Sequence, residues 1–427
     1  MGKRRLSFLN EVRDQIKSRE AKDFVEIELD YHIKEAKSHL LTKGIDETEA
    51  EEKAVGQMGS PVMLGQQLNK LHRPKVDWLT VVLLITTMGI GFLPLFSLGY
   101  MNNGHFAIYK IIFVLLGAGV ALGLMLINYR ELEKLGWLFY TIGVLVLIMI
   151  KALSKGFVFG TSVVEIGPVT IESVMSIPFF FLAWASFINN KRLKIWHLGM
   201  LFVLSFYLLF TIPSTSTAYI YTVMVFAMVW WSKYSRKTIL VITILTSSSF
   251  IIFGLILWPL LAFYQKLRLL EFINPEKYPT ATTLYIKERM CQAGWFGNSM
   301  NKETIVDAHT NFVFVSFTYH YGWLFGIALV VLLSLFASRI VVVLRKIKVP
   351  YGKLLLIGAI ALYTIQFVSN IGMSLGYFPM ISMSLPFISY GLMPILLNAF
   401  LIGVVLSVYR RKDLTSSHFS HIESGEI

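Results

Sequence analysis

A series of long apolar stretches after residue 77 constrains the fold more than any other feature of this sequence. A membrane-spanning helix needs about 20 predominantly apolar residues. The predicted spans cover, approximately, residues 78–98, 108–127, 137–151, 172–188, 195–212, 215–231, 238–263, 310–338, 354–376 and 386–408. Only 15% of the 427 residues are charged, whereas 55% are hydrophobic. The sequence therefore predicts an all-α polytopic membrane protein with about ten transmembrane helices, and it excludes a water-soluble enzyme.

The basic residues predict how the spans are oriented. Lys and Arg cluster in alternate connections, at residues 73–75, 130–134, 191–194, 233–237, 339–353 and 410–412. Short loops rich in Lys and Arg stay in the cytoplasm. We therefore expect cytoplasmic termini and one large extracellular loop at residues 265–309. This pattern also explains the net charge of +13 without a nucleic-acid partner.

The first 75 residues are predicted to lie in water rather than in the membrane, because they hold 14 Lys or Arg and 13 Asp or Glu. Helical spacing of apolar residues appears at Phe8 to Ile16 and at Phe24 to Ile33, including Ile27, and residues 48–58 predict a third amphipathic helix. We expect a cytoplasmic helical prefix domain at residues 1–75, a transmembrane domain at 76–411 and a cytoplasmic tail at 412–427. The prefix resembles the short helical domains that precede membrane segments in many Gram-positive proteins.

Four ionisable residues near the predicted outer surface are candidates for chemistry, because such groups are costly near a membrane unless they are paired or wetted. Glu172 could face an outer cavity or cap a helix start. Arg268 could bind a diphosphate or reach lipid phosphate. Asp307 could accept a proton or hold a divalent cation, and His309 could donate to phosphate. Each of the four also has a purely structural alternative.

Polar residues inside the last two spans give a second group of candidates. Gln366 and Asn370 lie one helical turn apart and could line a cavity or bond a neighbouring helix. Leu385 to Gly391, which includes Ser389 and Tyr390, places Pro and Gly at the entrance of a span. The sequence predicts a discontinuous or kinked helix there.

Two motifs resemble those of a known family. Residues 366–391 read QFVSNIGMSLGYFPMISMSLPFISYG, and residues 307–314 read DAHTNFVF. The first resembles the signature of the shape, elongation, division and sporulation (SEDS) family, which includes FtsW, RodA and SpoVE; the second is similar to that family's EAHTDFIF. Weaker matches lie at residues 170–172, 213–218 and 268–275, and the resemblance runs from Trp78 to Arg411.

The resemblance implies a peptidoglycan glycosyltransferase that polymerises lipid II and works with a transpeptidase of the class B penicillin-binding type. Together with the resemblance of the prefix domain to those of Gram-positive proteins, it implies the plasma membrane of a Gram-positive bacterium as the location. Asp307 and Asn311 are then the catalytic candidates, and the substrate-binding candidates are Glu172, Arg268, His309, Gln366, Asn370, Ser389 and Tyr390. No cofactor or metal site is assigned, although a divalent cation would be compatible with the chemistry.

The sequence departs from the family pattern where the family has its central acid. Asn311 replaces the Asp of His-Thr-Asp, and a carboxamide does not accept a proton near neutral pH. Ser214, Tyr319, His320 and the pair Leu392-Met393 also differ from the family pattern. The alternatives are therefore a noncatalytic scaffold or regulator of a penicillin-binding protein or SEDS relative, and a lipid-precursor flippase.

Overall fold

The computed structural model describes residues 3–93, 105–154, 156–158, 161–166, 169–212, 214–260, 263–274, 277–298, 305 and 307–414. The chain divides into two compact units. The first contains residues 1–77 together with 409–427, and the second contains residues 78–408.

Four helices form the N-terminal part of the first unit: α1 (Lys3–Asp14), α2 (Arg19–Leu41), α3 (Glu47–Gln57) and α4 (Pro61–Leu71). Ser18 and Asp46 cap α2 and α3 by accepting backbone N–H groups in the first turn. The apolar core includes Val12, Ile16 and Ile33. Ile27 is 56% exposed and lies outside this core, which corrects its assignment to the apolar face. The fourth helix was not anticipated.

The C-terminal end of the chain completes this first unit. The Leu414 side chain is only 6% exposed and belongs to the same core cluster. Arg411 is 1% exposed, and its Nη2 donates to Glu20 Oε1 over 2.6 Å. Lys75 Nζ pairs with Asp413 Oδ2 over 2.9 Å. The unit is therefore built from both ends of the chain.

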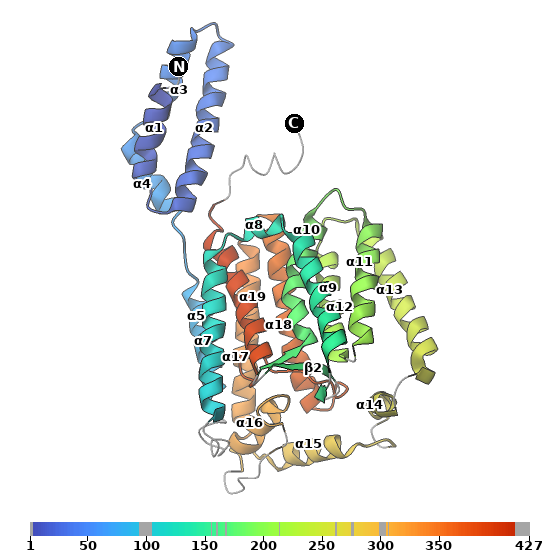
Figure 1. Cartoon of the computed structure of the whole chain (residues 1–427). Helices are drawn as coiled ribbons and strands as arrows, with labels where there is room; N and C mark the ends of the chain where they lie inside the picture. The colour runs from blue at the N-terminus through green and yellow to red at the C-terminus, as the bar shows by residue number, and fades with distance from the viewer. Residues whose placement is uncertain are drawn as a thin grey trace. The chain divides into compact units, whose positions relative to one another are not determined.

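The second unit is a helical bundle, and each of the ten predicted apolar stretches contains a helix (Figure 1). Five helices of the described chain are long and apolar enough to cross a membrane: α7 (His105–Leu126), α9 (Gly136–Leu153), α17 (Trp323–Arg345), α18 (Pro350–Ser374) and α19 (Leu392–Arg410). Shorter apolar helices are α5 (Trp78–Ile90), α10 (Ile177–Asn189), α11 (Ile195–Thr211) and α12 (Thr215–Trp230). The remaining elements are α8 (Tyr129–Glu133), α13 (Arg236–Leu257), η3 (Trp258–Leu260), α14 (Phe263–Ile273), α15 (Ala281–Gln292) and α16 (Val313–Tyr321). The all-α polytopic fold class is confirmed.

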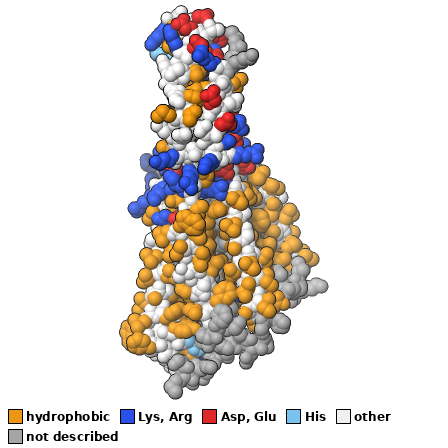
Figure 2. Space-filling model, turned by 90° about the vertical axis from the view of Figure 1, so that its left-hand side faces the viewer, with side chains coloured by type: hydrophobic (Ala, Val, Ile, Leu, Met, Phe, Trp, Pro, Cys, Tyr) orange, Lys and Arg blue, Asp and Glu red, His pale blue; other side chains and the backbone are white. Residues whose placement is uncertain are grey.

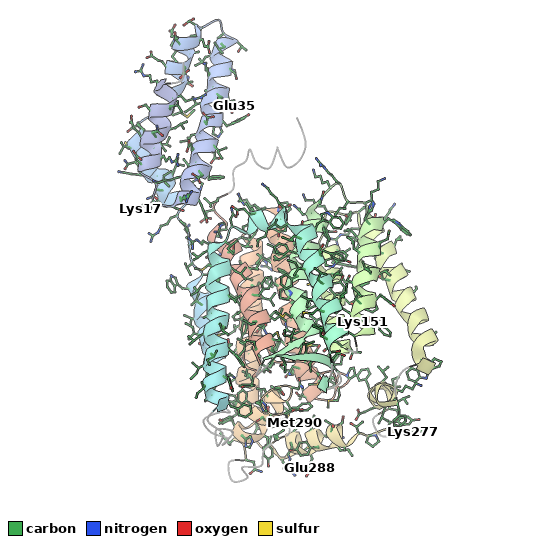
Figure 3. All side chains as sticks on the ribbon, viewed as in Figure 1. Lys17, Glu35, Lys151, Lys277, Glu288 and Met290 are labelled. Carbon is green, nitrogen blue, oxygen red and sulfur yellow. The ribbon has the colours of Figure 1, made fainter. Side chains whose placement is uncertain are left out.

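The exterior of the bundle has the character of a membrane protein. On the face shown in Figure 2, hydrophobic side chains cover the side of the second unit, and Lys and Arg side chains gather at one end of it. α14 and α15, which occupy the predicted large loop, lie at the opposite end from α8 (Figure 1). Figure 3 shows Met290 and Glu288 on opposite sides of α15, where Met290 is buried and Glu288 is exposed.

A small antiparallel sheet precedes α10 where the fourth span was expected to begin. Its strands are β1 (Gly156–Val158), β2 (Thr161–Ile166) and β3 (Val169–Glu172), in the order β1-β2-β3. Glu172 pairs with Val163 at the end of the β2–β3 ladder. The short helix η2 (Ser173–Ser176) follows, so the helix itself starts at Ile177 rather than at 172.

The eighth predicted span is divided at Gly322 into α16 and α17. Gly322 has φ of 90°, and an added Cβ would lie 2.2 Å from the Trp295 carbonyl oxygen. The backbone of residues 294–297 therefore approaches this point too closely for any side chain. The last span also starts late, because residues 386–391 form turns before α19 begins at Leu392.

Candidate functional site

A cavity of about 280 Å³ is lined by residues from five parts of the chain. The end of β3 contributes Glu172, the start of α12 contributes Ser214 and Thr217, and the loop before α16 contributes His309 and Asn311. Gln366 of α18 and the segment from Ser382 to Leu397 complete the lining. Among the described lining residues, Glu172 is the one acidic side chain. We call this space the first cavity.

A buried cluster of three hydroxyl groups fixes the chain beside Glu172. Ser173 Oγ donates to Ser214 Oγ over 2.6 Å and lies 2.8 Å from Thr217 Oγ1. Ser214 Oγ donates to Thr217 Oγ1 over 2.8 Å. These bonds hold the residue after Glu172 against the start of α12. Burial raises the pKa of Glu172, because desolvation disfavours the carboxylate form.

A tight turn presents the residues before α16. Asp307 adopts a left-handed conformation with φ of 54°. Its carbonyl oxygen accepts from the backbone N–H groups of Thr310 and Phe312, each over 3.1 Å. The turn directs His309, Thr310 and Asn311 to the first cavity. Burial and the nearby charge of Lys110 lower the pKa of His309, which favours its neutral form.

A second cavity of about 630 Å³ adjoins the same turn. Asp307 lines this second cavity, together with residues of α14, α15 and the segment from Met380 to Ser382. Asn311 and Ser382 line both cavities. Burial raises the pKa of Asp307. Asn311 therefore lies at the boundary between the first cavity, which Glu172 lines, and the second cavity, which Asp307 lines.

Glu271, the other acid of the second cavity, is occupied by local structure. Its Oε1 accepts from Thr280 N over 2.9 Å and from Thr280 Oγ1 over 2.8 Å. These bonds connect α14 to the start of α15. Among the described residues, no group of three or more His, Cys, Asp or Glu side chains could hold a metal ion.

Two of the predicted substrate-binding residues hold backbone instead of lining a cavity. Asn370 Nδ2 donates to the carbonyls of Asn311, over 2.8 Å, and Met383, over 2.6 Å. Ser389 Oγ donates to the Thr310 carbonyl over 2.7 Å and accepts from Leu385 N over 2.8 Å. Both residues therefore join the 307–311 turn to the wall formed by residues 382–391.

The other candidates fall into three groups. The first cavity brings together Glu172, His309, Asn311, Gln366 and Tyr390. Asp307 lies in the second cavity. Arg268 belongs to α14, but its side chain lies outside the described residues, as do Pro213 and Pro275 of the weaker motifs.

Sequence reasoning missed Ser382 and Lys110. Ser382 lies inside the longer motif, but nothing in its residue type separates it from the neighbouring serines. Lys110 lies near the start of α7, where a lysine usually extends its ammonium group to the membrane surface. In the structure its side chain is buried. A lone charge just inside an apolar stretch was the available signal.

Comparisons with known proteins agree with this architecture. A family model of FtsW, RodA and SpoVE, described as "Cell cycle protein", matches residues 76–414. The probable peptidoglycan glycosyltransferase FtsW of Idiomarina loihiensis is 22% identical over 366 residues, covering 79% of this chain and 88% of the relative. The protein of the same description from Coxiella burnetii is 26% identical over 326 residues, covering 71% and 86%.

Solved structures share the fold. A chain from a study of how a peptidoglycan synthase complex coordinates polymerization and crosslinking superposes with a TM-score of 0.68 at 22% identity, covering 79% of this chain and 98% of that one. The rod shape determining protein RodA of Thermus thermophilus gives a TM-score of 0.58 at 20% identity, covering 80% and 98%. Because the family model covers most of the chain, this protein belongs to the SEDS family of FtsW, RodA and SpoVE.

Proposed function

We propose that this protein is a cell-wall glycosyltransferase that extends glycan strands from a polyprenyl diphosphate-linked sugar such as lipid II. The observation that carries the proposal is the boundary that the two cavities share, at Asn311 and Ser382. A polymerising enzyme must hold a donor and an acceptor at once with their reacting atoms in contact. Two adjoining cavities meet that requirement.

The reaction needs a proton acceptor near this shared boundary. The acceptor sugar's hydroxyl oxygen attacks the donor's anomeric carbon, the bond from that carbon to the diphosphate breaks, and the hydroxyl proton passes to a base. Glu172 is the acid of the first cavity and Asp307 is an acid of the second. Burial raises the pKa of both carboxyl groups, which makes each a better proton acceptor near neutral pH.

We assign the base to Glu172, with Asp307 as the alternative. Glu172 shares the first cavity with His309 and Asn311, whereas Asp307 reaches only the second cavity among those described. His309, kept neutral by burial, is a hydrogen-bond donor for the departing diphosphate. The motifs that resemble the family also contribute His309, Gln366 and Tyr390 to the first cavity and not to the second, which supports the same assignment.

The amide of Asn311 favours a second candidate function. Where both cavities meet, this chain has an uncharged amide at the position where the family has an acid. A noncatalytic SEDS protein that binds the same lipid precursor and recruits a transpeptidase would tolerate this change. The fold shared with a chain from a peptidoglycan synthase study supports a transpeptidase partner under either function.

The same proposal includes the protein's location and orientation. We propose the plasma membrane of a Gram-positive bacterium, with both ends of the chain in the cytoplasm. The Glu20–Arg411 ion pair supports ends on the same side, because it joins a residue before the first span to one after the last. The basic connections support the cytoplasmic side.

Purified full-length protein in lipid nanodiscs, supplied with fluorescent lipid II, tests the proposal. We expect glycan chains on a gel from the unmodified protein and an activity loss of about 10²- to 10⁴-fold in Glu172→Gln. Asp307→Asn, tested in parallel, decides between the two acids. Glu288→Gln, on the exposed side of α15, is the matched control and should retain activity.

The outcomes separate the two candidate functions. Absence of product at every protein concentration, together with retained lipid II binding and co-purification of a transpeptidase, would establish the scaffold. Absence of both product and lipid II binding would contradict both candidates.

A further inference from the structure

A buried lysine lies in the second turn of α7 and contacts Ile388, two residues before Tyr390 of the first cavity. The Lys110 side chain is 2% exposed, although α7 is long and apolar enough to cross a membrane. In the described chain, no acidic side chain forms an ion pair with it, and its ammonium group donates to backbone carbonyls instead. A buried cation costs several kcal/mol unless its donors are satisfied, so this arrangement requires an explanation.

The carbonyls that Lys110 holds come from two distant segments. Its Nζ donates to the carbonyl of Gly91, just after α5, and to that of Ile388 over 2.9 Å. The ring of Phe92 lies 5.4 Å from the same atom. Lys110 therefore joins α7, the end of α5 and the wall segment in front of α19.

Three consecutive residues of that wall connect Lys110 to the turn before α16. Lys110 holds the carbonyl of Ile388, Ser389 Oγ donates to the Thr310 carbonyl, and Tyr390 N donates to the His309 carbonyl. Phe387, immediately before them, has φ of 64°, an uncommon conformation for a bulky residue. The surrounding contacts must hold this strained backbone in place.

The ammonium group itself does not reach either cavity, since Lys110 is absent from the described lining of both. Its surroundings are closely packed. A Cβ added at Gly91 would lie 2.9 Å from the Ile388 carbonyl oxygen and 3.1 Å from Lys110 Nζ. Two of its three N–H donors are already used by carbonyls.

We propose that Lys110 is a positioning residue, whose ammonium group fixes the wall at residues 388–390 and thereby sets the places of His309 and Asn311 in the first cavity. Its effect on catalysis rests on the proposed function, whereas its effect on the wall does not. The alternative, a cation that binds ligand phosphate directly, is an outcome of the test below.

Hydrogen exchange of the full-length protein in nanodiscs tests the positioning directly. In Lys110→Met, which keeps the length of the side chain but removes its donors, we expect amide exchange in residues 385–391 to become at least tenfold faster. Lys110→Arg, which keeps the charge and donors, should restore much of the protection. Lys151→Met, at an exposed lysine near the end of α9, is the matched control and should leave this segment unchanged.

Gly91→Ala provides a second variant that retains the lysine. Its added methyl group would displace the contact between Lys110 and Ile388, so we expect it to increase exchange in residues 385–391 as Lys110→Met does. If Lys110→Met does not fold, this variant still decides the question. Unchanged exchange at residues 385–391 in Gly91→Ala and in any folded Lys110→Met would overturn the proposal.

Kinetics distinguish positioning from direct binding. Misplacement of reacting groups lowers turnover, so Lys110→Met should reduce kcat by about 10- to 100-fold with little change in KM for lipid II. A raised KM with unchanged exchange would instead show a phosphate ligand and overturn the positioning role. If the unmodified protein makes no product, the proposed function fails, but the exchange experiment still tests Lys110.

Discussion

The backbone N–H of Tyr390 donates to the carbonyl of His309 over 2.6 Å, and this bond joins the two motifs that resemble the SEDS signature. One motif forms the turn before α16, and the other forms the wall before α19. Neither motif builds the first cavity alone. The arrangement explains why so many small and polar residues in this region bond to backbone.

Asn370 should be one of the most sensitive positions in the membrane unit. Its amide donates to two carbonyls, those of Asn311 and Met383, from a fully buried position. Asn370→Ala leaves both acceptors without this donor, at about 1 to 3 kcal/mol for each buried acceptor left unpaired. We expect a clearly lower melting temperature in detergent by intrinsic fluorescence. Asn190→Ala, at an exposed position, should melt like the unmodified protein, and equal melting of both variants would contradict this role.

Glu172 should make stability depend on pH. Burial raises its pKa in the folded state above the unfolded value, so folding favours the protonated form. This contribution is fully present below the unfolded pKa and is lost as the pH rises through the folded pKa. Glu172→Gln should therefore have a higher melting temperature than the unmodified protein at pH 8. The difference should disappear near pH 4, about the unfolded pKa of Glu.

The exposed Glu288→Gln variant serves as the control for this pH series, because its carboxyl group is in solvent in the folded state. A Glu172→Gln variant that melts below the unmodified protein at pH 8 would show that the carboxylate has a stabilising partner, contrary to the burial argument.

Asn311→Asp should increase glycan synthesis. The new carboxylate would lie at the boundary that the two cavities share. There it could take the proton from the hydroxyl group of the acceptor sugar. The gain has an upper limit of about 10²- to 10⁴-fold, the usual contribution of a general base. Initial rates with fluorescent lipid II measure it, with Asn190→Asp as the control for added charge. A folded variant with unchanged or lower rates would refute the idea that the amide limits turnover.

Most helices of the second unit were predictable because they coincide with long apolar stretches of the sequence. Each apolar stretch contains a helix, but the ends nearest the cavity were wrong by several residues. Residues 169–176 form a strand and a short helix, and residues 386–391 form turns. At these places hydroxyl groups and main-chain contacts with distant segments decide the backbone, and a local pattern contains no information about distant partners.

The sequence indicated several residues that line the first cavity, but it did not indicate how the candidates divide between the two cavities. Glu172, His309 and Asn311 line one cavity, but no spacing in the sequence could place Asp307 on the other side of Asn311. The family resemblance implied substrate binding for Asn370 and Ser389, and for Asn370 a hydrogen bond to a neighbouring helix was the alternative. The structure shows that they satisfy buried carbonyls, an equally strong reason for a polar residue there. Lys110 was missed because its carbonyl partners are not visible in any side-chain pattern.

Arg411 should stabilise the N-terminal unit. Its buried guanidinium donates to Glu20, and Leu414 nearby contributes to the unit's core. Arg411→Met should destabilise the unit by about 1 to 3 kcal/mol, because a hydrogen bond between charged groups is lost. Leu414→Ala should cost about 2 kcal/mol or more.

Limited proteolysis of the full-length protein measures both effects as faster cleavage within residues 15–60. Lys412→Met, which removes a charge next to Arg411, is the control. Equal cleavage rates in all these proteins would show that the C-terminal residues contribute nothing to this unit.

The contribution of Leu414 to the core of the N-terminal unit also has a consequence for biogenesis. The ribosome makes the four helices of this unit before the hydrophobic segments of residues 78–408, but it adds Leu414, which packs into their core, after those segments. The unit therefore reaches its final packing only after every hydrophobic segment between residues 78 and 408 has been synthesised. A chain that stalls or is cut before residue 414 leaves this unit without the Leu414 side chain, so the packing of the unit depends on synthesis of all the hydrophobic segments that precede Leu414.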